Sequence, residues 1–129
     1  MANNEFKIRH DQDNAFYYEQ SVSRTIRENF DDVESIELNL HFKYDEIDTH
    51  NKLTLTDTDK AFFKIKCINR DCIHGGFNLT GDVYEAFRTK SSKISGQMTC
   101  DGWQDYERFK ARHHHCLCQL KYDVNINYK

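Results

Sequence analysis

The sequence predicts an α+β domain with an antiparallel sheet of about four strands, one N-terminal helix and one or two short helices. Three observations indicate this fold class. Segments 35–44 and 120–128 alternate apolar and polar residues with the period of a half-buried strand. Segment 15–30 repeats apolar residues every four positions, as an amphipathic helix does. The remaining strand-like segments follow one another without the regular strand–helix alternation of a parallel sheet.

The N-terminal helix is expected over residues 15–30. Its apolar stripe consists of Tyr18, Val22, Ile26 and Phe30. A stripe at this spacing is typical of a core-facing helix, so we expect all four side chains to be buried. Residues 1–13 are polar and are expected to be loose.

The strands are expected at 35–44, 61–67, 94–100 and 120–128, where apolar residues fall on alternate positions. The acidic connection over 45–60 contains one further short strand-like stretch at 53–56. A short helix is expected over 82–90, with Asp82 as its N-cap and with Val83 and Phe87 facing the core.

Length and composition indicate one domain spanning residues 1–129. The chain is 38% hydrophobic and 13% aromatic, which is enough to form a core. It contains no apolar run near the ~18 residues that a membrane span requires, and its start lacks the plan of a signal peptide. We therefore expect a cytoplasmic protein without a membrane partner, in which cysteines stay reduced.

The five cysteines are the residues that point most clearly to chemistry. They are Cys67, Cys72, Cys100, Cys116 and Cys118. Their spacing is C-x4-C, a long gap to a single cysteine, and then C-x-C. Thiolates bind zinc strongly, and structural zinc takes four tetrahedral ligands. Several of these cysteines end or begin a predicted strand, so we expect them to meet at one edge of the sheet.

This arrangement resembles zinc-ribbon-like domains in general, over roughly the second half of the chain. It departs from their usual pattern in two places, since the first pair is C-x4-C instead of C-x2-C and the last pair is C-x-C. The resemblance implies one structural zinc ion within a metal-binding region at 61–118. The expected ligands are Cys67, Cys72, Cys100 and Cys116.

The fourth ligand has alternatives. Cys118 continues the inward face of the last strand and is expected to be a buried thiol, but it can exchange roles with Cys116. A histidine from the tract His113-His114-His115 can also take the fourth position.

Net charge differs between the two parts of the chain. Residues 1–60 carry seven Lys/Arg against fourteen Asp/Glu, whereas 61–129 carry eleven against seven. Two differently charged faces of one domain explain this asymmetry, and a mildly basic face for an anionic partner is the alternative. The segment expected to contact a partner contains Trp103, Arg108, Lys110 and Arg112, although Trp103 can instead cover the metal site or the core edge.

These observations favour a non-enzymatic zinc-binding module that interacts with protein or nucleic acid. The chain has no Walker loop, no Gly-x-Ser-x-Gly and no His-Glu-x-x-His motif. One alternative is a metalloenzyme that uses His113–His115 with cysteine ligands. A further alternative is a thiol redox protein that uses Cys116 and Cys118.

Overall fold

A computed structural model describes residues 2–69, 72, 75–100, 102–104 and 114–129; of residues 2–10, 103–104 and 114–115 it describes the backbone. The fold is α+β and contains a four-stranded antiparallel sheet, as the sequence predicted. Its strands are β1 (Val33–Tyr44), β2 (Ile47–Thr56), β5 (Lys93–Thr99) and β8 (Gln119–Tyr128). They lie in the order β2-β1-β8-β5.

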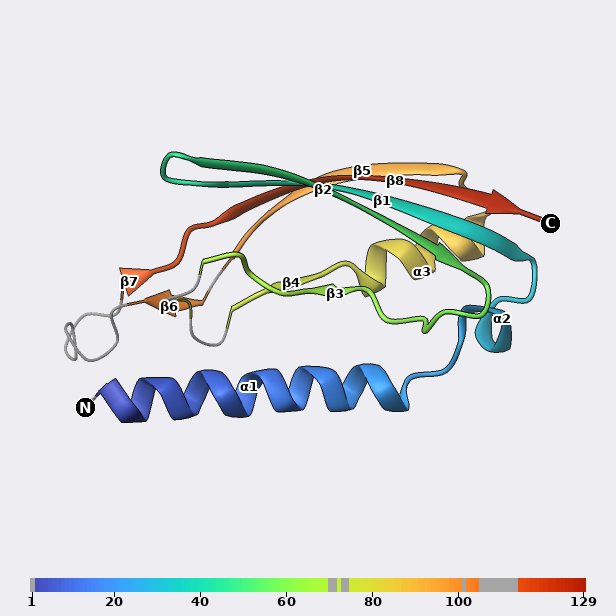
Figure 1. Ribbon diagram of the computed structural model, residues 1–129. Helices are drawn as coiled ribbons and strands as arrows, with labels where there is room; N and C mark the ends of the chain where they lie inside the picture. Colours follow the sequence, from blue (N-terminus) through green and yellow to red (C-terminus); the bar gives the residue numbers. More distant parts are fainter. Residues whose placement is uncertain (1, 70–71, 73–74, 101, 105–113) are drawn as a thin grey trace.

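A second layer lies against one face of this sheet (Figure 1). It contains helix α3 (Thr80–Thr89) and the short antiparallel pair β3 (Lys64–Ile65) and β4 (Phe77–Asn78). Helix α1 (Ala2–Val22) runs along the far side of β3 and β4, and α2 (Ile26–Asn29) leads from it into β1. A third pair, β6 (Trp103–Gln104) and β7 (His114–His115), lies at one end of the molecule.

The core forms between the sheet and the second layer. Alternate residues of β1 and β8 point into it, as the period-two pattern predicted. The sheet contributes Ile36, Leu38, Leu40, Phe42, Leu120, Tyr122, Val124 and Ile126, and the second layer contributes Phe63, Phe77, Leu79, Val83, Ala86 and Phe87. The opposite face of the sheet is polar.

One predicted strand belongs to the second layer instead of the sheet. Segment 61–67 forms only the two-residue strand β3, which pairs with β4. The strand beside β1 is β2, which covers ten residues where the sequence predicted a connection with a short strand-like stretch. The sequence did not reveal β2 because this edge strand is exposed over most of its length on both faces, so its residues do not alternate.

The predicted N-terminal helix is two helices. The chain leaves helical geometry at 23–25, and the Glu28 carboxylate accepts hydrogen bonds from the Thr25 backbone N–H (3.1 Å) and hydroxyl (2.8 Å), which fixes the start of α2. The break divides the expected apolar stripe. Ile26 is fully buried, but Tyr18 and Val22 are 69% and 60% exposed, so the prediction that they lie in the core is wrong. Residues 2–13 belong to α1.

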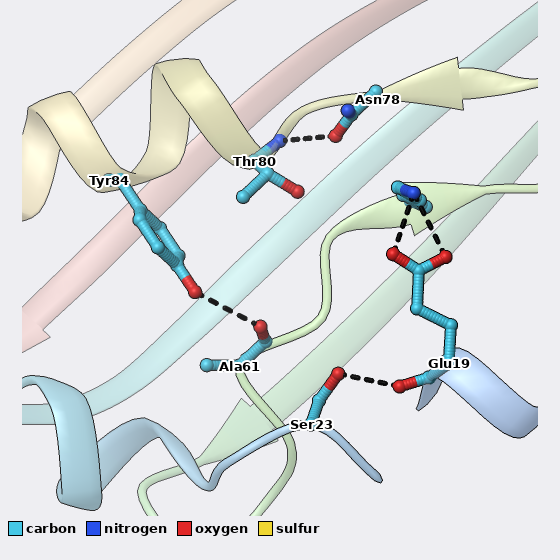
Figure 2. A network of polar contacts seen from close by, with 7 residues as sticks. Glu19, Ser23, Ala61, Asn78, Thr80 and Tyr84 are labelled. Atoms are coloured by element: carbon cyan, nitrogen blue, oxygen red, sulfur yellow. Dashed lines mark hydrogen bonds and ion pairs between the residues drawn. The ribbon is translucent and has the colours of Figure 1, made fainter. Parts of the chain in front are cut away.

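Helix α1 is joined to the second layer by a few side chains. Phe16 makes an edge-to-face ring contact with Phe62 at 5.0 Å between centroids. Glu19 accepts a 2.7 Å ion-pair hydrogen bond from Lys64 of β3, and Ser23 closes the end of the helix by donating to the Glu19 carbonyl, as Figure 2 shows for Glu19 and Ser23. The exposed Lys64–Glu19 ion pair contributes little free energy compared with the core.

Helix α3 begins two residues earlier than predicted. The Asn78 side chain accepts a hydrogen bond from the Thr80 N–H at 3.0 Å at its start, so Asp82 is not the cap (Figure 2). Asp82 instead accepts a hydrogen bond from the hydroxyl of Tyr122, which ties α3 to the sheet. Burial and this hydrogen bond raise the pKa of Tyr122 to about 12. Val83 and Phe87 are buried, as predicted.

The break between α1 and α2 leads to a prediction about stability. Ile26→Ala should lower the free energy of unfolding by about 2–5 kcal/mol, because it removes a fully buried side chain. Val22→Ala should change it by less than about 0.5 kcal/mol, because Val22 is exposed. Urea unfolding of the two variants measures both values, and equal losses would show instead that one continuous buried stripe exists.

Candidate metal centre

Four cysteines from three separate stretches of chain come together at the end of the molecule that carries β6 and β7. Cys67 and Cys72 lie in the connection between β3 and β4. Cys100 directly follows β5, and Cys116 directly follows β7. The ends of strands in two layers therefore place the four side chains, and the cluster does not lie on one sheet edge as the sequence analysis expected.

The four sulfur atoms are close enough to share one ion. All Sγ atoms lie within 4.8 Å of one another, and the Cys67–Cys116 and Cys72–Cys100 Sγ–Sγ distances are 3.5 and 3.6 Å. A tetrahedral ion with metal–sulfur bonds near 2.3 Å requires sulfur–sulfur distances of about 3.8 Å. The cysteines are free, and these distances are far beyond the ~2.05 Å of a disulfide. The cluster can thus hold a metal ion with little rearrangement.

N–H groups directed at the sulfur atoms surround the cluster. The buried Asn69 side chain donates from Nδ2 to Cys116 Sγ at 3.2 Å. The backbone N–H groups of Gly76 and Gly102 both donate to Cys100 Sγ at 3.4 Å. Hydrogen bonds of this kind stabilise negative charge on sulfur and orient it, as the outer shell of a metal site does.

Two glycines make room for the sulfur atoms. A Cβ atom on Gly102 would lie 2.5 Å from Cys72 Sγ and 2.6 Å from the Gly75 Cα atom. A Cβ atom on Gly75 would likewise lie 2.5 Å from Cys100 Sγ. All three distances are well below van der Waals contact, so the backbone can approach the cluster this closely only at glycine.

The pKa values of two cysteines in the cluster are shifted in opposite directions. The pKa of Cys116 is lowered because its sulfur accepts hydrogen bonds from the other three cysteines, of which Cys100 contributes most. The pKa of Cys67 is raised by its hydrogen bonds with the same group, again led by Cys100. Four thiolates at this distance repel one another, so the full set can ionise together only around a cation.

Cys118 is the fifth cysteine, and its side chain interacts with Cys67 at the border of the cluster. It is fully buried in line with Leu120 and Tyr122, and burial raises its pKa. Its backbone carbonyl accepts a 2.7 Å hydrogen bond from the Cys100 N–H, which holds the end of β5 beside the start of β8. Cys118 is not among the four clustered sulfur atoms.

Leu117 separates the roles of Cys116 and Cys118. In an extended C-x-C segment both cysteines would point to the same side of the chain. Leu117 instead has a φ of 58°, in the left-handed region, and its side chain is 64% exposed. The resulting turn lets Cys116 face the cluster while Cys118 faces the core.

The structure places the other predicted residues only in part. Trp103 belongs to β6, and His114 and His115 belong to β7; for these three the backbone is described. Arg108, Lys110, Arg112 and His113 lie outside the described residues. Their proposed roles in partner binding or metal ligation therefore stay predictions.

Sequence reasoning missed Asn69 and the spatial role of the two glycines. The glycines had a signal, because each follows a cysteine by two or three positions, in Cys72-x-x-Gly75 and Cys100-x-Gly102. Asn69 had none, since a lone asparagine in a loop is most simply read as part of a turn.

The chain matches no protein-family model, no curated protein and no solved structure. Within the part of the chain that the structure describes, no helix is both long and apolar enough to cross a membrane. The geometry of the cysteine cluster is therefore the basis for assigning a function.

The left-handed turn at Leu117 predicts opposite effects for two substitutions. Leu117→Gly should keep or raise the unfolding temperature, because glycine adopts this φ without strain and little apolar burial is lost. Leu117→Val should lower stability by about 1 kcal/mol or more, because a β-branched side chain resists this conformation. Thermal unfolding compares the two, with Leu53→Val as the control on an exposed strand position. A Leu117→Val variant as stable as Leu117→Gly would contradict the turn.

Proposed function

We propose that this chain is a small zinc-stabilised module in which Cys67, Cys72, Cys100 and Cys116 hold one structural zinc ion. The observation that carries the proposal is the convergence of these four sulfur atoms, mutually within 4.8 Å, from three distant stretches of chain. Four thiolates favour zinc over hard cations such as calcium and magnesium, which prefer oxygen. A reduced cytoplasm, where thiols persist, is the compartment that suits such a site.

The arrangement around the cluster supports a zinc-ribbon-like site. Cys67 and Cys72 lie in the loop of the β3–β4 pair, and Cys100 and Cys116 flank the β6–β7 pair. Two ligand pairs, each carried by a two-stranded unit, resemble the two halves of a zinc ribbon. The C-x4-C spacing of the first pair is accommodated by the close approach of Gly75 to the sulfur atoms.

The closed ligand set supports a structural role in preference to a catalytic one. Catalytic zinc sites keep one coordination position for water or substrate, whereas four protein ligands fill the tetrahedron. Three of the four cysteines are buried and only Cys67 is partly exposed. The same geometry weighs against redox chemistry between Cys116 and Cys118, because Cys118 stands outside the cluster.

The activity proposed for the module, taken as one domain over 1–129, is binding to another protein or to nucleic acid. The segment that follows Gly102 leaves the metal centre with Trp103 and carries Arg108, Lys110 and Arg112. An aromatic residue interleaved with cations suits an anionic partner. The zinc ion would hold both ends of this segment, since Cys100 and Cys116 flank it.

Metal analysis tests the proposal. Protein purified without a chelating column should contain about one zinc per chain. Ser in place of Cys67, Cys72, Cys100 or Cys116 should remove the zinc and lower the unfolding temperature, and a chelator should do the same to the wild type. Cys118→Ser should keep the zinc. Metal-free protein with an unchanged unfolding temperature, or zinc lost from Cys118→Ser and kept by Cys116→Ser, would contradict the assignment.

A pair of glycine variants tests the same site with every cysteine in place. Gly102→Ala should weaken zinc binding at least tenfold in competition with a chromophoric chelator, because its Cβ would displace Cys72 Sγ. Gly81→Ala is the matched control, since a Cβ at Gly81 meets nothing within 4 Å. Equal zinc affinity of the two variants would show that the metal lies elsewhere.

A further inference from the structure

A second group of metal-ligating side chains lies on the polar face of the sheet, in the β1–β2 hairpin. It consists of His41 of β1 with Asp48 and His50 of β2. His41 and His50 are directly opposite each other in the antiparallel register, and Asp48 precedes His50 by two residues on the same face. No part of the cysteine cluster or of its surroundings contributes to this group.

One ligand atom from each of the three side chains lies within 4.8 Å of the other two. The Asp48 Oδ1 atom lies 2.6 Å from His41 Nε2 and 3.4 Å from His50 Nε2. The two imidazole rings are stacked, with centroids 3.9 Å apart and planes 15° from parallel. Around an ion with bonds near 2.1 Å to nitrogen and oxygen, neighbouring ligand atoms lie about 3.4 Å apart in a tetrahedral arrangement. To bind one ion, the His41–Asp48 contact has to open and the stacked rings have to tilt so that their nitrogen lone pairs meet, which the exposed Asp48 and His50 side chains permit.

The local charges decide which kind of ion suits the group. Asp48 supplies the one carboxylate of the group, and its side chain is exposed. Lys43 lies opposite Asp48, and Lys121 of β8 lies opposite His41. Lys52 is paired with Glu37 at 3.4 Å. The group therefore has one carboxylate with two lysines opposite its members. This charge balance attracts a hard cation only weakly, because such an ion relies on negative charge and oxygen ligands. Imidazole nitrogens bind zinc, nickel and copper without needing such an excess of negative charge.

We propose that His41, Asp48 and His50 form an open surface site for a divalent transition metal ion. Two imidazoles and one carboxylate supply three ligands, and water or a group from a partner supplies the rest. The site is independent of the structural zinc proposed above, because the two ligand sets share no residue.

Paramagnetic broadening by Ni²⁺ tests the site in the full chain. Reduced protein, as purified, is titrated with Ni²⁺ while amide signals are followed by NMR. Signals of the hairpin around residues 41 and 48–50 should broaden at low Ni²⁺. In His50→Ala this broadening should require at least tenfold more Ni²⁺, and in Asp48→Asn it should also shift to higher concentration. Lys52→Ala, on the same face of β2, is the matched control and should behave as the wild type.

Hairpin signals that stay sharp while other regions broaden would place the ion at the cysteines or at the tract of His113–His115, and would overturn the proposal. Broadening of the hairpin that His50→Ala leaves unchanged would also overturn it, because His50 would then not be a ligand of the ion. Unchanged signals outside the hairpin show that each exposed variant is folded.

Discussion

The convergence of four cysteine sulfur atoms constrains the chain more than any other feature of this molecule. Thiols whose sulfur atoms lie 3.5–3.6 Å apart cannot all ionise without a cation, and these four come from three stretches of chain that are far apart in sequence. The local backbone is arranged around this requirement. Gly75 and Gly102 let the chain approach the sulfur atoms, the left-handed turn at Leu117 separates Cys116 from Cys118, and Asn69 directs an N–H group at Cys116.

The two ends of the molecule are stabilised by different means. At one end, β1, β8 and α3 enclose a continuous apolar core, which burial of hydrophobic surface alone can hold together. At the other end, the four cysteines lie in the loop between β3 and β4 and beside β6 and β7, and each of these strands has only two residues. Strands this short do not hold independently. A metal ion at the four cysteines would supply the missing cross-links, since thiolate–zinc bonds contribute on the order of 10 kcal/mol in small zinc peptides.

The sequence predicts the parts of this structure that are buried on one face only. Strands β1 and β8 alternate apolar and polar residues because one side meets the core and the other meets water. Strand β2 is exposed on both faces, so its side chains carry no period, and the stripe of Tyr18, Val22, Ile26 and Phe30 conceals a helix break. A signal for that break exists in Thr25-x-x-Glu28, the pattern of a capping box. The spacing of the cysteines indicates a shared site. His41 and His50 come together only through the pairing of β1 with β2, and the sequence alone does not predict the register of that pairing.

X-ray absorption at the zinc edge tests the central claim most directly, because it reports the ligand atoms around the ion without depending on stability or activity. Protein that carries one equivalent of zinc should show a single shell of four sulfur atoms at about 2.3 Å. A shell in which nitrogen or oxygen replaces sulfur would place a histidine, a carboxylate or water among the ligands. That result would contradict the assignment of Cys67, Cys72, Cys100 and Cys116 as a closed structural site.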